Sequence, residues 1–162
     1  RRSSDLRDFL KQPHMQAKQP PVLRIAVSET DRDAAKRLLA EQKLPVTDIT
    51  EDTILYSLEQ DGRPIGTAGL DIFADCALLR SISVLSDIRG KGYGKTLNDQ
   101  VEDYAKESGI RCLYLITHTA KDFFSRQGYC VISRDEAPEP IRQTDQFIGL
   151  CPSSAVVMKK RI

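Results

Sequence analysis

The stretch RGKGYGKT at residues 89–96 decides the fold, because it joins an apolar run at residues 76–85 to a helix-like run at residues 97–108. This order predicts a strand, a glycine turn and a helix. Glycine tolerates a positive φ and has no Cβ, so a loop with glycine at positions 90, 92 and 94 can direct successive backbone N–H groups to one point. That point lies at the positive end of the following helix, where a phosphate or pyrophosphate binds favourably.

Two known nucleotide-binding motifs resemble this loop, but each differs from it at one required glycine. A P-loop that ends in Gly94-Lys95-Thr96 would need glycine at position 89, where the chain has Arg89. The dinucleotide fingerprint would need its third glycine at position 95, which is lysine. The remaining pattern is R-x-x-G-x-G, after a predicted strand that ends at Val84. The alternative interpretation of this pattern is a glycine-rich strand-to-helix turn that binds no ligand.

The composition favours a single soluble domain. The chain has 162 residues, of which 40% are apolar and 29% are charged, and its net charge is +1. Five basic and two acidic residues fall in residues 1–20, but the near-neutral total argues against a nucleic-acid partner. The sequence has neither a run of 18 apolar residues nor an apolar signal-peptide core, so we expect a cytoplasmic protein without a membrane partner.

The cysteines do not have the spacing of a metal site. Cys76, Cys112, Cys130 and Cys151 include no C-x-x-C pair, and the chain has only two histidines. The first three lie in apolar, strand-like runs, which favours buried free thiols. We therefore predict no metal.

The chain is predicted to consist of an N-terminal extension at residues 1–21, bounded by a proline pair, and one domain at residues 22–162. The predicted strands lie at residues 22–27, 53–60, 64–70, 76–84, 111–117, 129–133 and 155–160. Helices are predicted after an N-cap at Ser28 or Thr30, at residues 97–108, at residues 120–127 after a cap at Thr119, and around residues 141–147.

Residues 76–117 are predicted to form one β-α-β unit. The run CLYLI at residues 112–116 is typical of a strand buried on both faces, as in a parallel pair. In open α/β sheets ligands bind beyond the carboxyl ends of the parallel strands. This rule brings Thr117 toward the loop at residues 89–94.

A second motif, T-x-x-A-x-x-F-F-x-x-x-G-Y, spans residues 117–129. Together with R-x-x-G-x-G, it resembles the GNAT acyltransferase superfamily, and the resemblance covers residues 22–162. The resemblance implies an α/β GNAT fold with a mixed central sheet of about six to seven strands flanked by about four helices. Two of these helices would follow the first strand directly.

A finer resemblance is to a subgroup often encoded beside arsenic-resistance genes and, more loosely, to the acetyltransferase domain of N-acetylglutamate synthases. It rests on short stretches at residues 44–48, 78–81, 113–115 and 147–155. It implies acetyl transfer from acetyl-CoA to the amine of a small molecule, such as an amino acid or a toxic amino-acid analogue. The oligomeric state is left open, with a homodimer among the alternatives.

The resemblance also implies which residues bind acetyl-CoA. Backbone groups of the strand before the loop would pair with the pantetheine amides and polarise the acetyl carbonyl, and the loop would hold the pyrophosphate. The implied residues are Ile82, Ser83, Val84, Arg89, Gly90, Lys91, Gly92, Gly94, Lys95, Thr117, Ala120, Phe123 and Phe124. Lys91 and Lys95 could instead be ordinary solvated charges.

The chain departs from the family pattern at the positions of the general acid and the general base. Many family members have a tyrosine, the general acid, where this chain has Phe124, and an asparagine where it has Thr117. Some relatives have a glutamate base at the position of Leu78. The two usual proton carriers are therefore missing.

Four side chains are candidates for the remaining roles. Thr117 or Ser81 could hold a water that removes the amine proton, and Asp71 could act as a remote base or as a turn residue. Arg80 interrupts an apolar strand, where a charge must be paired, so we expect it to bind a substrate carboxylate or to form an internal salt bridge. His118 could shuttle a proton, although a lone histidine at a strand end is more often a surface group.

Two other classes of function compete with a small-molecule N-acetyltransferase. The loss of both proton carriers favours a non-catalytic acyl-CoA-binding sensor or subunit. Acetylation of a protein N-terminus or lysine would need an open groove, which the sequence does not reveal.

Overall fold

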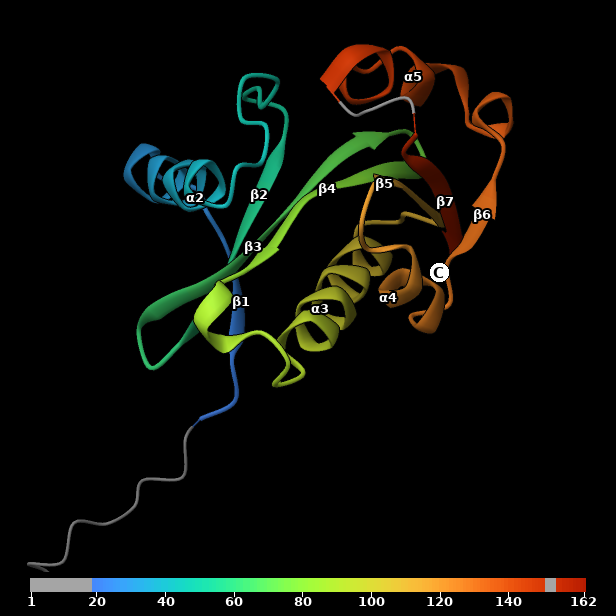
Figure 1. Ribbon diagram of the computed structural model, residues 1–162. Coiled ribbons are helices and arrows are strands. Elements are labelled where there is room, and N and C mark those ends of the chain that lie inside the picture. The colour runs from blue at the N-terminus through green and yellow to red at the C-terminus, as the bar shows by residue number, and fades with distance from the viewer. Residues whose placement is uncertain (1–18, 151–153) are drawn as a thin grey trace, which may run out of the picture.

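The computed structural model describes residues 19–150 and 154–162, and its centre is a seven-stranded mixed sheet of order β1-β2-β3-β4-β5-β7-β6 (Figure 1). The strands are β1 (Val22–Ile25), β2 (Ile54–Gln60), β3 (Arg63–Phe73), β4 (Cys76–Val84), β5 (Cys112–Thr117), β6 (Cys130–Ile132) and β7 (Val156–Arg161). Only β4 and β5 pair in parallel; the other neighbours are antiparallel. All seven predicted strands are present, with ends shifted by at most a few residues.

The helices are α2 (Glu29–Glu41), α3 (Tyr93–Glu107), α4 (Lys121–Arg126), α5 (Glu139–Arg142) and a π-helix, η3 (Gln146–Leu150). Two short 3₁₀ turns, η1 (Ser86–Ile88) and η2 (Arg134–Glu136), complete the described elements. No helix in the described part of the chain combines the length and the apolar character needed to cross a bilayer.

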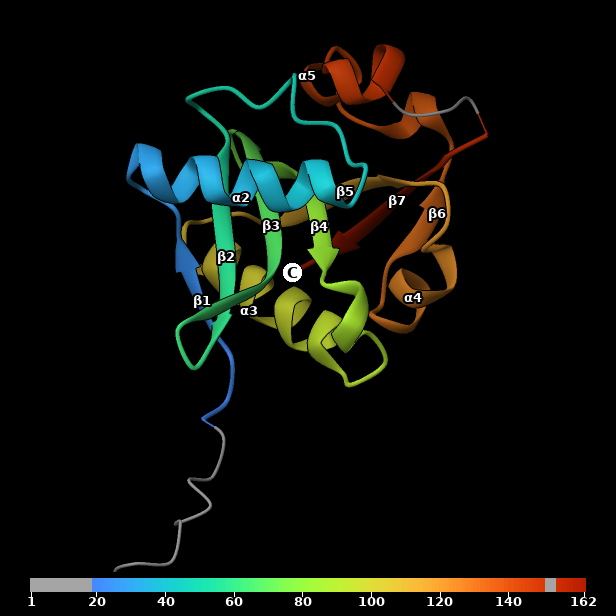
Figure 2. The ribbon, with the colours of Figure 1, turned by 60° about the vertical axis from the view of Figure 1, so that its left-hand side comes forward.

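The helices cover both faces of the sheet (Figures 1 and 2). Helix α3 buries Leu97, Val101 and Ala105, which recur every four residues and face the main core cluster. Helix α2 covers the opposite face over β2 and β3, whereas α5 and η3 lie over β4 and β5. The second face therefore has two separate apolar clusters.

Strands β4 and β5 separate after a short parallel contact. They pair only from Cys76 with Cys112 to Leu78 with Tyr114. Beyond these pairs β4 continues to Val84 and β5 to Thr117 without pairing to each other. Figure 2 shows β4 running toward the loop before α3 while β5 lies on the side of β7 and β6. This separation opens the sheet at the predicted ligand edge.

Three local predictions were wrong. Helix α3 begins at Tyr93, so Gly94 lies in its first turn and only Gly90 and Gly92 precede it. No second helix lies between α2 and β2, because the described residues 42–53 form turns. Helix α4 is not capped by Thr119; the Thr117 hydroxyl oxygen accepts the Ala120 backbone N–H at 3.0 Å.

The cysteines are only partly as predicted. Cys76, Cys112 and Cys130 are free thiols, but Cys76 and Cys112 are only half-buried, and Cys130, on the edge strand β6, is exposed. Cys151 lies outside the described residues.

Candidate functional site

The loop between β4 and α3 borders a groove of about 720 Å³, which we call the glycine-loop groove. Ten of the predicted acetyl-CoA residues line it: Ile82, Ser83, Val84, Arg89, Gly90, Gly92, Gly94, Lys95, Ala120 and Phe123. Its charged lining residues are Arg89, Lys95 and Arg126, and none of its lining residues is acidic. The groove is therefore suited to an anionic ligand.

The glycines leave room for such a ligand. Gly90 and Gly92 have φ values of +85° and +82°, and a Cβ built on either residue would meet no atom within 4 Å. Gly92 is the N-cap residue of α3, so the unpaired N–H groups of the first helical turn follow directly after it. These observations fit a pyrophosphate, because an open helix N-terminus with small residues binds anions through its backbone.

Arg89 anchors the loop. Its Nε donates to the backbone oxygen of Val84 at 3.1 Å, and one terminal nitrogen donates to Gln42 Oε1 at 2.8 Å. The side chain therefore connects the end of β4 to the end of α2. Lys95 forms an exposed ion pair with Asp99, which raises the pKa of its ammonium group.

A second cavity of about 520 Å³ lies between the separated strands, and we call it the inter-strand pocket. Residues 79–82 of β4 form one wall, and residues 115–117 of β5 form another. It shares Leu44, Ile82, Thr119, Ala120 and Phe123 with the glycine-loop groove, so the two cavities adjoin. Thr117, Ser81, Arg80 and Phe124 line this pocket.

Strand β4 has a bulge in the wall of the inter-strand pocket. Pairing with β3 shifts between Arg80 and Ser83, so that β4 has one extra residue, and Ser81 has a φ of +56°. Such a conformation is strained for serine. It is held by two hydrogen bonds: Arg80 Nε donates to Ser81 Oγ at 3.1 Å, and Thr67 Oγ1 donates to Ser81 O at 2.9 Å.

Arg80 forms the internal salt bridge that the sequence offered as an alternative. Its two terminal nitrogens donate to both carboxylate oxygens of Asp48 at 2.5 Å, and one of them also contacts Asp71 Oδ2 at 3.3 Å. The Arg80 and Asp48 side chains are only 2% and 4% exposed. Burial opposes the charged guanidinium, but the bonds to Asp48 and the charges of Asp48 and Asp71 raise the pKa of Arg80.

Asp71 lies apart from the inter-strand pocket. Its Oδ1 accepts the Thr53 hydroxyl at 2.6 Å, and the residue lines a different cavity behind Arg80. Leu78 is buried with Tyr114 and Ile141, away from both site cavities. Neither side chain is therefore placed to touch a ligand in the inter-strand pocket.

His118 lines the inter-strand pocket next to Thr117. The only interaction described for its ring joins Nδ1 to Ser154 Oγ at 3.2 Å. His118 and Lys91 are both exposed, but Lys91 belongs to the lining of neither site cavity.

Sequence analysis missed the residues that the α2–β2 connection and η3 contribute. Gln42 and Leu44 line the groove, and Lys43, Pro45 and Gln146 line the pocket. The stretch at residues 44–48 supported the family resemblance, but no chemistry pointed to it. These residues reach the site only through the fold, since they are far from the glycine loop in sequence.

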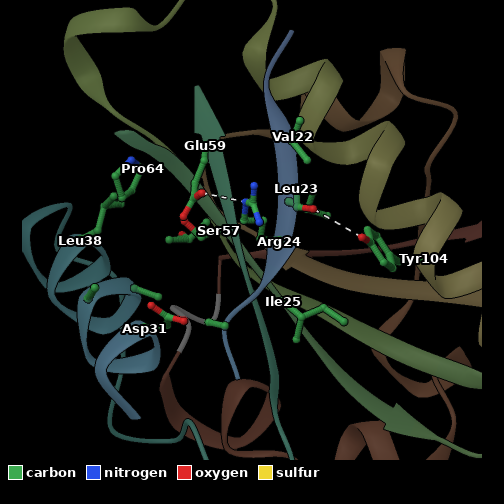
Figure 3. A pocket seen from close by; sticks show the side chains of 14 residues that line it. Val22, Leu23, Arg24, Ile25, Asp31, Leu38, Ser57, Glu59, Pro64 and Tyr104 are labelled. Carbon is green, nitrogen blue, oxygen red and sulfur yellow. Dashed lines mark hydrogen bonds and ion pairs between the residues drawn. The ribbon is translucent and has the colours of Figure 1, made fainter. Parts of the chain in front are cut away.

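A hollow of about 560 Å³ between β1, β2 and α2 contains none of the predicted site residues (Figure 3). Arg24 and Glu59 form an ion pair at 3.0 Å there, and the Tyr104 hydroxyl donates to the backbone oxygen of Leu23 at 3.4 Å. Within residues 19–150 and 154–162, no group of three or more metal-ligating side chains is arranged to hold an ion.

The model of the acetyltransferase (GNAT) family matches residues 18–129 of this chain. An amino-acid acetyltransferase from Neisseria meningitidis is 33% identical over 88 residues, which are 53% of this chain and 20% of that protein. The chain thus spans about a fifth of the length of this curated relative.

Solved structures share the fold. N-acetylglutamate synthase from Neisseria gonorrhoeae, complexed with coenzyme A and N-acetyl-glutamate, is 26% identical with a TM-score of 0.71 and covers 89% of this chain and 35% of its own. Tetrahymena GCN5, at 16% identity, has a TM-score of 0.70 over 87% of this chain and 96% of its own, and supports the fold alone. The predicted fold class is confirmed. Because the family model covers well over half of its residues, the chain belongs to the acetyltransferase (GNAT) family.

Proposed function

We propose that this protein transfers the acetyl group of acetyl-CoA directly to the amine of a small molecule, most simply an amino acid. The observation that carries the proposal is the adjoining pair of cavities at the point where β4 and β5 separate. A donor in the groove and an acceptor in the pocket would meet beside the part of β4 that does not pair with β5. Positioning of this kind supplies much of the rate enhancement in a direct transfer.

The groove residues suit acetyl-CoA. Gly90, Gly92 and the first turn of α3 would hold the pyrophosphate, with Arg89 and Lys95 nearby; Lys91 lies in the same loop and is exposed. Backbone groups at residues 82–84 would pair with the pantetheine arm and polarise the thioester carbonyl, since β5 leaves this part of β4 unpaired. The coenzyme A in the Neisseria gonorrhoeae structure supports this assignment.

The pocket residues suit an acceptor with a carboxylate. The charged or titratable lining residues are Lys43, Arg80 and His118, and none of the lining residues is acidic. An α-amino acid offers both the amine to be acetylated and a carboxylate that Lys43 would favour, whereas the charge of Arg80 is already paired with Asp48. The description of the Neisseria meningitidis relative as an amino-acid acetyltransferase supports the same class.

We assign removal of the amine proton to His118 or to a water held by Thr117 or Ser81. Among the side chains that line the pocket, histidine is the type that exchanges a proton near neutral pH. Arg80 would act indirectly, through Ser81, because its guanidinium is already bonded to Asp48.

The test is a thiol-release assay with acetyl-CoA and a panel of the twenty amino acids, several toxic amino-acid analogues and an N-terminal alanine peptide. Turnover above background with an amino acid or analogue supports the proposal, and calorimetry should show acetyl-CoA binding without acceptor. The likeness to the arsenic-resistance subgroup is a prediction that the analogues test.

A non-catalytic acyl-CoA-binding module is the second candidate, favoured by Phe124 and Leu78 at the positions of the usual proton carriers. Tight acetyl-CoA binding with no turnover across the panel would support it. Turnover with the peptide alone would instead favour a protein N-acetyltransferase.

A further inference from the structure

A buried charged cluster lies in the seam between the two apolar clusters on the second face of the sheet. The Arg80 side chain lies between the apolar cluster under α2 and the apolar cluster under α5. Gly69 leaves room for it, because a Cβ built on Gly69 would lie only 3.2 Å from Arg80 Cγ. The Arg80 guanidinium is bonded at both ends to the Asp48 carboxylate. A two-point contact between a planar guanidinium and a carboxylate fixes orientation as well as distance.

Asp48 joins three parts of the chain at this point. It belongs to the connection at residues 42–53, which lacks regular structure, and it reaches Arg80 on β4, 32 residues away in sequence. Its Oδ2 also accepts a hydrogen bond from Gln146 Nε2 of η3 at 3.3 Å. The same connection contributes Leu44 and Pro45 to the inter-strand pocket, and η3 contributes Gln146. The Asp48 carboxylate therefore ties together three segments that line the pocket: the connection at residues 42–53, strand β4 and η3.

The third nitrogen of the Arg80 guanidinium reaches the bulge. Arg80 Nε donates to Ser81 Oγ, next to the positive φ that turns the following residues of β4. A strained residue persists only where its surroundings hold it. The guanidinium thus links the pocket walls to the part of β4 that would present its backbone to the thioester.

We propose that Asp48 is a positioning residue that sets the shape of the inter-strand pocket, and so the acceptor geometry, through Arg80. This inference rests on the proposed acetyl transfer, with the acceptor in that pocket. Asp48 itself is not among the lining residues of the pocket, so its effect is indirect. Loss of the tie should misplace the acceptor but leave acetyl-CoA binding largely intact, because Gly90, Gly92 and the first turn of α3, which would hold the pyrophosphate, lie outside the inter-strand pocket.

The experiment compares the wild type with Asp48→Asn and with the control Asp52→Asn, the same change at an exposed position of the same connection. Three quantities are measured: acetyl-CoA affinity by calorimetry, kcat and KM for the amino acid with the highest turnover in the panel, and amide hydrogen exchange of residues 42–53. For Asp48→Asn we expect acetyl-CoA affinity within about twofold, and kcat/KM for the amino acid reduced by about 10²-fold, mostly in KM. Amide exchange at Leu44, Ile49 and Thr50 should accelerate, whereas Asp52→Asn should match the wild type.

An unchanged acceptor KM, or equal losses of acetyl-CoA and acceptor binding, would overturn the inference. Asp48→Asn leaves the buried guanidinium with Asp71 as its described carboxylate partner and could fail to fold. In that case the double variant Asp48→Asn/Arg80→Gln, which removes both charges, decides. A raised acceptor KM together with faster amide exchange in residues 42–53 supports positioning, and a wild-type KM or unchanged exchange refutes it. If the wild type acetylates no amine, the proposed function fails, and unchanged exchange in residues 42–53 of Asp48→Asn would separately show that no tie exists.

Discussion

Gly94 is the residue at which the first turn of α3 and helix α4 come into contact. A Cβ built on Gly94 would lie 3.3 Å from two ring atoms of Phe123, which is closer than most such contacts. The Gly94 backbone is not in the left-handed region, so its conformation allows a larger residue. A larger side chain would be opposed only by steric contact with the Phe123 ring. Both residues line the glycine-loop groove, and a substitution here acts directly on the groove.

We predict that Gly94→Val weakens acetyl-CoA binding by at least about tenfold, equivalent to about 1.4 kcal/mol, because the added methyl groups displace the Phe123 ring or enter the groove. Isothermal titration calorimetry measures the change. Thr96→Val is the control, since it places the same side chain in the same helical turn but outside the lining of the groove. Equal affinities for Gly94→Val and the wild type would contradict the placement of the donor.

His118 is the residue on which the proposed proton removal depends most. We predict that His118→Gln lowers kcat by about 10²- to 10⁴-fold, the usual contribution of a general base, without changing acetyl-CoA affinity. Glutamine keeps hydrogen-bonding groups next to Ser154 but cannot carry the proton. If kcat falls by less than about threefold, a water held by Thr117 or Ser81, or direct loss to solvent, is the better assignment.

At the scale of elements, helix α4 depends on the last residue of β5. The Thr117 hydroxyl oxygen accepts the Ala120 N–H, and the described contacts of α4 include no side-chain cap at Ala120 itself. The helix has only six residues, so one satisfied N–H is a large share of its terminal hydrogen bonds. The side chain thus couples the end of the parallel strand to the helix that supplies Phe123 and Phe124.

We predict that Thr117→Val destabilises the protein by about 1 kcal/mol, the usual cost of losing a capping oxygen, and that Thr117→Ser, which keeps the oxygen, costs less. Urea denaturation followed by circular dichroism gives both values. The Thr117→Val variant should also lose acetyl-CoA affinity, because Ala120 and Phe123 line the groove. Equal stabilities of the two variants would show that the hydrogen bond contributes nothing.

Strand β4 shows how much of the fold and the site could be predicted. Its apolar run predicted both ends, Cys76 and Val84, and the glycine pattern identified the loop that follows. The bulge at Ser81 was not predictable, because a serine with positive φ has no local sequence signal. The Asp48 partner of Arg80 was missed because the pair joins segments 32 residues apart through the tertiary fold. Local patterns identified the loop at which we propose that the donor binds, and long-range pairing shapes the pocket that we propose for the acceptor.

At the scale of the whole molecule, one large apolar cluster joins the sheet to α3 and α4. Tyr56 on β2 belongs to this cluster and is only 2% exposed. Its ring lies against Tyr104 of α3, with the centroids 5.5 Å apart. Burial, reinforced by the nearby Tyr104 hydroxyl, raises the pKa of Tyr56 from 10.0 to about 12.

Because the pKa of Tyr56 is raised in the folded protein, the free energy of unfolding decreases at alkaline pH. In the unfolded chain the phenol ionises near pH 10, whereas in the folded protein it stays protonated until about pH 12. The unfolded state therefore loses its proton first, and the free energy of unfolding falls between these two pH values. Below pH 10 the contribution is fully present, and its complete loss amounts to about 3 kcal/mol at most.

We predict that Tyr56→Phe removes this part of the alkaline destabilisation. The variant should lose stability less steeply than the wild type between pH 9.5 and pH 11.5, about the range in which the two tyrosine states differ in protonation. Urea denaturation at several pH values measures both slopes, and the lysines, which lose protons in the same range, affect both proteins alike. If the stability of the wild type and of Tyr56→Phe fell with pH at the same rate, solvent would reach the Tyr56 hydroxyl in the folded protein. The sheet and α3 would then pack less tightly around Tyr56 than its 2% exposure indicates.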